Sequence, residues 1–353
     1  MDKKVTISEV ADRAGVSKAT VSNYLNKRYD RMKEETKKRI QEAIDSLDYV
    51  PSISARRLSA KEKSKTIGLI IPRNLAHVFD TMYYPTVFNA IGKISEETGY
   101  SVLIYVQNKQ VADDNLDYLL GLAKSLVDGF LIFALSPEDR YFKEFEKNKI
   151  PYVCVGEIPH YVDYNFVATD HGQGIRDAVN YLIELGHKKI ALVTEDKLSV
   201  VDEARKNTYK QVLMEHGIDY EKKYCRSFLS EEVTEQVPRF LKGLFEDKDR
   251  PTGILIPANL LHYLKKAVKE NDLYIPKDLS VIAIDYYDIY YPEYVRFQDR
   301  EYTKIPSAAY KVSEKAFEKL IELIENPEKG FASYLEPVKL EIGKTTGVKR
   351  EEV

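Results

Sequence analysis

Residues 5–26 read VTISEVADRAGVSKATVSNYLN, which is two short helical patterns separated by a single glycine. Thr6 and Glu9 have the spacing of a capping box, in which each side chain accepts a hydrogen bond from the other residue's backbone amide, so a helix is predicted to begin there. Gly15 is predicted to end this helix, because glycine adopts the left-handed conformation that lets the chain turn sharply. Ser17 is the predicted cap of a second helix.

A third helix is predicted over residues 34–47, where apolar side chains recur at the spacing of a buried helical stripe. Three short helices suffice to close a small core. Two helices joined by a tight turn with glycine, the second of them (residues 18–26) rich in small polar side chains, are typical of the helix-turn-helix, whose second helix enters the major groove of DNA. A small helical protein-interaction domain is the alternative interpretation.

The charge of the chain is distributed unevenly between its two parts. Residues 1–65 hold 16 basic and 10 acidic residues, net +6, whereas the remaining residues hold 37 basic and 46 acidic, net −9. A basic head on an acidic body favours a module that binds a polyanion. Hydroxyl and amide side chains of the second helix are suited to reading base edges, and its basic neighbours are suited to neutralising phosphates: Lys18, Lys27 and Arg28.

The motifs of residues 5–26 resemble those of the LacI/GalR family of bacterial transcription regulators, and the similarity continues through residues 35–36, 47–51 and 55–58. It covers the whole predicted headpiece, residues 1–50. Asn23 departs from the family pattern, because many members have arginine at this position. The operator sequence that other members read is therefore not transferable to this chain.

A linker over residues 51–65 opens with Pro51 and closes with a charged run. Residues 53–58 are long enough for one or two helical turns that become ordered when a partner supplies packing; a flexible tether is the alternative. The resemblance implies a hinge helix that pairs with its dimer mate on DNA and inserts Leu58 into the minor groove, bending the duplex. DNA contacts are expected from Thr6, Ser17, Lys18, Ala19, Thr20, Ser22, Asn23, Asn26, Ala55, Arg57 and Leu58.

Short apolar runs of strand length recur through residues 66–353, and amphipathic stretches of helical length separate most of them. This alternation predicts parallel sheets with crossover helices, and a run of this length predicts two doubly wound lobes. Ligands on such folds bind beyond the carboxyl ends of the strands. The predicted strands lie at residues 67–71, 102–106, 130–133, 152–155, 190–193, 254–256 and 281–284.

The resemblance extends more weakly over this core, through residues 181–192, 258–259 and 275–285. It implies a periplasmic-binding-protein-like fold. The expected fold is therefore a small all-α helix-turn-helix headpiece and an α/β core of two doubly wound parallel-sheet lobes. We expect the core to occupy residues 66–353, with the first lobe at about 66–164 and 298–327 and the second at about 165–297 and 328–345.

The resemblance also implies an effector site in the cleft between the lobes, where family members clamp sugar hydroxyls with an arginine, an asparagine and an aspartate. By position these are Arg205, Asn259 and Asp285, whose groups donate and accept in the fixed directions that a polyol requires. Arg205 has the alternative of a surface ion pair with neighbouring acids. Aromatic side chains after predicted strands are expected either on the apolar side of the site or in the core: Phe79, Tyr83, Tyr84 and Phe133.

The cleft departs from the family at several positions. Leu260 replaces an aspartate that commonly follows the asparagine, and Phe133 stands where relatives often place a polar ligand. Gly343 replaces a frequent arginine. These departures indicate an effector that is less polar than a simple hexose, or bound differently.

Motifs of enzymes and cofactor sites are incomplete. Residues 343–345 read Gly-Lys-Thr but lack the first glycine of a P-loop, and residues 171–174 lack the third glycine of a dinucleotide fingerprint. No histidine pair or serine elbow indicates a hydrolase, and two scattered cysteines, Cys154 and Cys225, do not form a metal site. We therefore expect no enzyme activity, no cofactor and no metal.

The combined interpretation is a transcription repressor that binds a pseudo-palindromic operator as a homodimer. A small effector, expected to be a sugar or sugar derivative, would modulate its affinity for double-stranded DNA. Without a secretory signal or a membrane-length apolar run, the protein is expected in the cytoplasm and, when bound to DNA, at the nucleoid. Two alternatives remain: a ligand-insensitive DNA-binding protein with a vestigial cleft, and a sugar-binding protein or enzyme.

Overall fold

The computed structural model of this 353-residue chain divides into two compact units, Met1–Thr66 with Asp113–Asp128 and Ile67–Ala112 with Gly129–Val353. No helix of the described residues is long and apolar enough to cross a membrane. The structure describes residues 5–26, 28–29, 32–50, 63–71, 82–106, 112–133, 141–156, 164–195, 199–287, 302–330 and 333–349.

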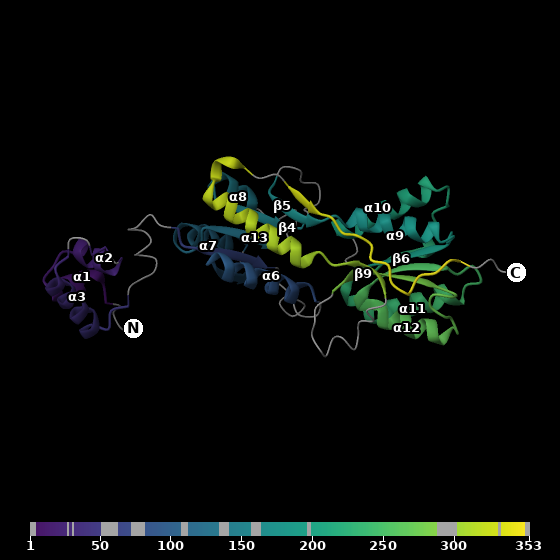
Figure 1. Cartoon of the computed structure of the whole chain (residues 1–353), viewed down its shortest axis with the longest axis horizontal. Helices are drawn as coiled ribbons and strands as arrows, with labels where there is room; N and C mark the ends of the chain where they lie inside the picture. The colour runs from purple at the N-terminus through teal and green to yellow at the C-terminus, as the bar shows by residue number, and fades with distance from the viewer. Residues whose placement is uncertain are drawn as a thin grey trace. The chain divides into compact units, whose positions relative to one another are not determined.

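The headpiece contains the three predicted helices, α1 (Ile7–Ala14), α2 (Lys18–Leu25) and α3 (Glu34–Ser46) (Figure 1). The predicted capping box is present, because the Thr6 amide donates to Glu9 Oε2 at 2.7 Å and the Glu9 amide donates to Thr6 Oγ1 at 3.4 Å. Gly15 ends α1 in the left-handed conformation, with φ 63. The helices close one small apolar cluster of buried side chains: Val10, Ala11, Ala14, Val21, Ile40, Ala43 and Tyr49.

The first sheet of the core has the strand order β11-β5-β4-β3-β1-β2, and the recorded pairings in it are parallel. Helix α13 (Ala309–Glu325) packs along α6 (Tyr83–Thr98) and contacts β3, β4 and β5. The strands are β1 (Thr66–Ile71), β2 (Ser101–Val106), β3 (Gly129–Phe133), β4 (Tyr152–Val155), β5 (Phe166–Thr169) and β11 (Tyr334–Glu336); α7 (Ala112–Ser125) precedes β3 and α8 (Tyr141–Lys147) precedes β4.

The second sheet has the parallel order β10-β9-β8-β6-β7. Helices α9 and α10 cover one face of it, and α11 and α12 cover the other (Figure 1). Leu192 accordingly packs in one cluster and its neighbours Ala191 and Val193 in another, as strands buried on both faces require. The elements are α9 (His171–Glu184), β6 (Ile190–Thr194), α10 (Val200–Glu215), η1 (Lys222–Tyr224), β7 (Cys225–Ser227), η2 (Ser230–Glu232), α11 (Val233–Glu246), β8 (Gly253–Pro257), η3 (Ala258–Leu260), α12 (Leu261–Glu270), β9 (Ser280–Tyr286), β10 (Thr303–Pro306) and η4 (Pro327–Lys329).

Three strands belong to a different lobe from the one expected from the sequence. β5 pairs with β4 in the first sheet, although its residues are expected in the second lobe. β10 pairs with β9 in the second sheet, although its residues are expected in the first lobe. β11 pairs with β5 and so returns to the first sheet. The expected boundaries are wrong for these strands because periodicity indicates a strand but not the neighbour with which it pairs.

Candidate functional site

The exposed side of α2 carries most of the residues predicted to contact DNA. Lys18, Ala19 and Asn23 are exposed, as is the cap residue Ser17, whereas Val21 is fully buried in the headpiece core. Ala19, Asn23 and Asn26 lie four and three residues apart, which places them on one face of the helix. Thr20, Ser22 and Asn26 are half-buried.

Hydrogen bonds fix both the start of α2 and its orientation on α3. Ser17 Oγ accepts from the Thr20 amide at 3.1 Å and lies 2.8 Å from the Thr20 hydroxyl. The Tyr24 hydroxyl donates to Gln41 Oε1 on α3 at 2.7 Å. Because Tyr24 is held on the inner side, the polar residues before it are held on the outer side. The helix is therefore a rigid support for its outward-facing polar side chains.

Four predicted site residues lie outside the described residues: Ala55, Arg57 and Leu58 of the linker, and Phe79 after β1. Thr6 is described and exposed, and its hydroxyl donates to Glu9 Oε2 at 3.0 Å as part of the capping box.

A pocket lies where β5, β9 and β10 end and α9 begins, which is where parallel α/β folds bind ligands. Arg205 and Asp285, which the sequence analysis places together, meet in it: Arg205 Nη2 donates to Asp285 Oδ2 at 2.6 Å. Arg205 is 5% exposed at its side chain, so it is a pocket residue and not a surface ion pair. The lining residues are Thr169, His171, Ile175, Arg205, Ile284, Asp285, Ile305, Pro306 and Val338.

His171 is the residue of this pocket that contacts the ion pair from the side of α9. Arg205 Nη2 lies 3.1 Å from His171 Nδ1. Burial, and then the charge of Arg205, lower the pKa of His171 from 6.5 to about 4. Burial alone would raise the pKa of Asp285, but the charge of Arg205 and the hydrogen bond that Arg205 donates hold it below its ordinary value. The pocket thus contains an ion pair beside a neutral imidazole.

Asp285 has a backbone conformation that aspartate rarely adopts inside a strand. Its φ is 53, in the left-handed region, although it lies near the end of β9. Such a conformation costs roughly 1 to 3 kcal/mol and persists where the surrounding structure imposes it, often at functional sites. Here Tyr286, the next residue, is 1% exposed in the core while Asp285 faces Arg205. The strain therefore turns the carboxylate toward the pocket.

The other predicted effector residues lie outside the pocket lining. Asn259 is exposed, and its amide donates to both carboxylate oxygens of Glu195 at 2.9 Å. Phe133 is 1% exposed and belongs to the apolar core. The Tyr84 ring contacts both the Tyr83 ring, at 5.0 Å between centroids, and the Phe133 ring, at 6.3 Å. Burial raises the pKa of Tyr83 to about 12. These aromatic residues were expected either on the apolar side of the site or in the core, and Phe133 lies in the core.

Comparison with known proteins gives matches over both parts of the chain. The family model for bacterial regulatory proteins of the lacI family matches residues 6–52, and the model for a periplasmic binding protein-like domain matches residues 179–346. A probable HTH-type transcriptional regulator, EndR of Paenibacillus polymyxa, is 29% identical over 343 residues, which are 95% of this chain and 95% of that protein. The chain belongs to the lacI family of bacterial regulatory proteins.

This lacI-family protein shares its fold with solved structures over nearly its whole length. The lac repressor dimer bound to operator and the anti-inducer ONPF has a TM-score of 0.74 at 22% identity and covers 98% of this chain and 100% of that chain. The complex of the transcriptional regulator CelR with cellobiose has a TM-score of 0.67 at 20% identity, and the match covers 97% of this chain and 99% of the CelR chain. These structures show the fold, with the headpiece and two-lobed core that the sequence predicts. The lacI-family model and the curated relatives identify the protein as a DNA-binding transcription regulator and not an enzyme.

His171 of this lacI-family regulator is not among the site residues predicted from the sequence. Residues 171–174 form only an incomplete dinucleotide fingerprint there. The structure places His171 in the first turn of α9, directly after β5, with Asp170 as the helix cap. A polar side chain that follows a buried strand at its carboxyl end is the local feature that marks such a position.

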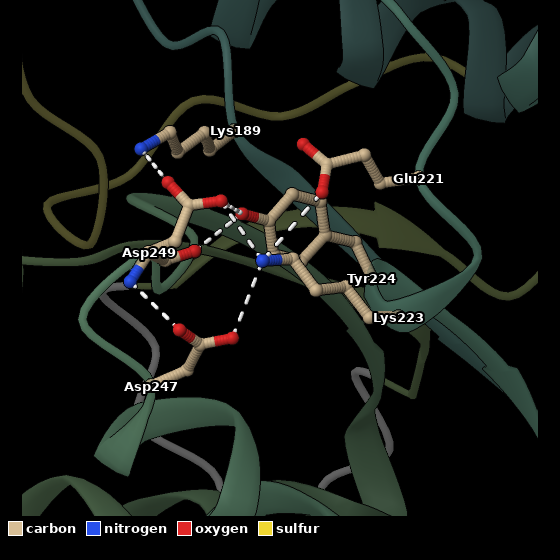
Figure 2. A network of polar contacts seen from close by, with 6 residues as sticks. All are labelled: Lys189, Glu221, Lys223, Tyr224, Asp247 and Asp249. Carbon is tan, nitrogen blue, oxygen red and sulfur yellow. Dashed lines mark hydrogen bonds and ion pairs between the residues drawn. The ribbon is translucent and has the colours of Figure 1, made fainter.

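A second polar network of the lacI-family regulator joins the residue before β6, η1 and the segment after α11 (Figure 2). Asp249 accepts hydrogen bonds from Lys189, from Lys223 at 2.8 Å and from the Tyr224 hydroxyl at 3.0 Å, which together lower the pKa of its carboxyl. Lys223 also pairs with Asp247 at 3.2 Å. These charges satisfy one another, so the network ties three segments together. Among the described residues, no cluster of metal ligands is found.

Proposed function

We propose that this regulator is a repressor that binds a pseudo-palindromic operator as a homodimer, and that a small hydroxyl-bearing effector in the pocket changes its affinity for DNA. One observation carries the proposal: a chain with a helix-turn-helix also holds a pocket in which Arg205 and Asp285 meet at 2.6 Å beside His171. The lac repressor dimer on its operator and the cellobiose complex of CelR support it, because both have this fold.

DNA recognition is assigned to α2. Exposed Asn23 presents an amide, which pairs with base edges in the major groove, and exposed Lys18 presents a charge for phosphate. A dimer would place two such helices about 34 to 36 Å apart, one turn of DNA, and so read two half-sites related by a two-fold axis. A pseudo-palindrome is therefore the expected operator.

The linker, residues 51–65, is the proposed element through which effector binding reaches DNA. A ligand shifts an equilibrium between DNA-competent and incompetent arrangements only through its different affinity for the two, which is typically worth about 1 to 3 kcal/mol. Separation of the two linker segments in the dimer would remove Leu58 from the minor groove. Contacts of the headpieces with phosphates would remain, and these are weak and depend on salt.

The first test is selection of bound fragments from sheared genomic and randomised DNA by the full chain near physiological salt. A pseudo-palindrome with half-sites one helical turn apart is expected. Asn23→Ala should then lower affinity for the selected site about tenfold or more while leaving affinity for unrelated DNA unchanged. Glu42→Gln is the matched control, because Glu42 is exposed on α3. A single unpaired half-site would contradict the dimer.

A second variant tests the linker. Leu58→Ala should reduce binding to the selected site much more than binding to unrelated DNA, because an apolar wedge contributes only where the duplex is bent. Equal loss on both DNAs would refute the role of Leu58.

A third test measures operator affinity with and without candidate sugars, beginning with cellobiose. A sugar that changes the affinity should lose its effect in Arg205→Met, whereas the DNA affinity of the variant without sugar should stay within a few fold. Operator binding that responds to no sugar would favour the alternative of a ligand-insensitive regulator with a vestigial cleft.

A further inference from the structure

The contact between Arg205 and His171 determines where the imidazole carries its proton. Arg205 Nη2 lies 3.1 Å from His171 Nδ1. A guanidinium group has five N–H donors and no acceptor, so the imidazole nitrogen that faces it must offer a lone pair. His171 is therefore neutral, with its single proton on Nε2.

The surroundings hold His171 in this form. Asp285 holds the guanidinium of Arg205 through a hydrogen bond of 2.6 Å, and the Arg205 side chain is only 5% exposed. Arg205 Nη2 therefore cannot move away from His171 Nδ1 without breaking its hydrogen bond with Asp285. A proton on Nδ1 would point at the N–H donors of Arg205, and a doubly protonated ring would in addition place two positive charges side by side. Burial disfavours the charged imidazole as well.

The Nε2–H group of His171 has no hydrogen-bond acceptor among the residues that the structure describes. Within the ranges that the structure describes, the side chain of His171 makes one hydrogen bond, at Nδ1, and His171 is among the residues that line the pocket. A donor in such a position favours a ligand that brings an oxygen lone pair. The apolar side chains beside it suit the carbon face of that ligand: Ile175, Ile284, Ile305 and Val338.

The charges of the polar wall sum to zero. Arg205 is positive, Asp285 is negative and His171 is neutral, so the guanidinium is already balanced inside the pocket. A phosphate or carboxylate on the ligand would approach Asp285, whose carboxylate already neutralises the charge of Arg205 that would attract it. Unfavourable contacts with a competitor contribute to specificity alongside favourable contacts with the ligand.

We propose that His171 is a specificity-determining residue of this pocket, which donates from Nε2 to an oxygen of an uncharged, hydroxyl-bearing ligand and thereby favours free sugars over sugar phosphates. This inference rests on the proposed effector function of the same pocket. It adds a residue that neither the sequence motifs nor the ion pair by itself identifies.

Two substitutions separate the roles of the two ring nitrogens. His171→Asn retains an acceptor near the position of Nδ1, so it should keep the contact with Arg205 but lose the donor. His171→Gln extends its amide toward the position of Nε2 and should keep a donor in the pocket. We expect the Asn variant to bind a neutral sugar about tenfold more weakly than wild type, and the Gln variant to lie between them. His216→Asn is the control, because His216 bonds Asn180 at an exposed position of the same lobe.

The tautomer is measured directly by nitrogen NMR of the full chain with labelled histidine at pH 7, and the His171→Asn spectrum assigns the signal. A proton on Nε2 and none on Nδ1 supports the proposal. A proton on Nδ1, or a doubly protonated ring, overturns it. This measurement needs no ligand, so it holds whether or not the effector is known.

The ligand class is measured by titration calorimetry with cellobiose and with two matched pairs, glucose and glucose 6-phosphate, and ribose and ribose 5-phosphate. The proposal is supported if a free sugar binds, if His171→Asn weakens that binding, and if the phosphorylated form of the same sugar binds more weakly than the free sugar. Tighter binding of a phosphorylated partner, an unchanged affinity in His171→Asn, or no binding by any free sugar overturns it. The proposed repressor function fails separately, by absence of a palindromic site in the DNA selection.

Discussion

The carboxylate of Asp128 accepts a hydrogen bond of 2.7 Å from the backbone amide of Ser64, which lies 64 positions earlier in the chain. The Asp128 amide in turn donates to the Thr66 carbonyl at 2.8 Å, and the Thr66 amide donates to Ser64 Oγ at 3.1 Å. Lys65, between them, has the left-handed φ of 46. The end of the linker therefore enters β1 through a tight turn that Asp128 holds in place.

Asp128→Ala should lower the free energy of unfolding by about 1 to 3 kcal/mol, because the Ser64 amide loses a charged acceptor. Asp128→Asn keeps one acceptor oxygen and should lose less. Urea denaturation at pH 7 measures both. Asp117→Ala, at an exposed position of α7, is the control and should change stability by about 0.5 kcal/mol or less. Equal losses for Asp117→Ala and Asp128→Ala would show that the hydrogen bond is not stabilising.

Replacement of Lys65 tests the strain in the same turn. Lys65→Gly should be more stable than Lys65→Ala by about 1 kcal/mol, because a Cβ is unfavourable at positive φ and glycine has none. The order should reverse at Lys242, an exposed position inside α11, where glycine costs about 1 kcal/mol relative to alanine. Thermal denaturation of the four variants gives both comparisons. The same order at both positions would argue against a strained turn.

The pairing of Arg205 with Asp285 should appear as a coupling energy. Arg205→Met and Asp285→Asn should each destabilise the chain by about 1 to 3 kcal/mol, since each leaves a partly buried partner unpaired. The double variant should cost less than the sum of the two by about 1 kcal/mol or more. Arg239 and Glu235, an exposed pair at 2.9 Å, form the matched control cycle, with an expected coupling of about 0.5 kcal/mol or less.

The pKa of His171 predicts how stability depends on pH. This pKa is lowered from 6.5 to about 4 in the folded chain, so between these values the unfolded chain binds a proton that the folded chain does not. The stabilisation is full above pH 6.5 and is lost as the pH falls toward 4, by up to about 3 kcal/mol. Asp285 does not offset this effect, because the charge of Arg205 holds the pKa of its carboxyl below its ordinary value.

Urea denaturation at pH 7 and at pH 4.5 checks this dependence. Wild type should lose more stability between the two pH values than His171→Asn, because asparagine does not titrate. His216→Asn should behave like wild type. Parallel losses in wild type and His171→Asn would mean that His171 is protonated alike in the folded and unfolded chains.

Features that depend on near neighbours in the sequence were predictable. The capping box of Thr6 and Glu9, the left-handed Gly15 and the Ser17 cap each act within four residues, and all three are present. Strands with long apolar runs, such as β3 and β8, were predicted for a similar reason, since burial on both faces requires continuous apolar sequence. Short strands with little apolar sequence, such as β7 and β11, were not predicted.

The sequence by itself determined the headpiece, the αβ order of the core and, through its family resemblance, the candidates Arg205 and Asp285. Only the tertiary structure decided which sheet β5, β10 and β11 join, that Asn259 bonds Glu195, and that His171 completes the pocket. The reason is physical. Caps and periodicity arise from contacts along one segment, whereas strand partners, ion pairs and the position of a histidine proton depend on the groups that folding brings opposite one another.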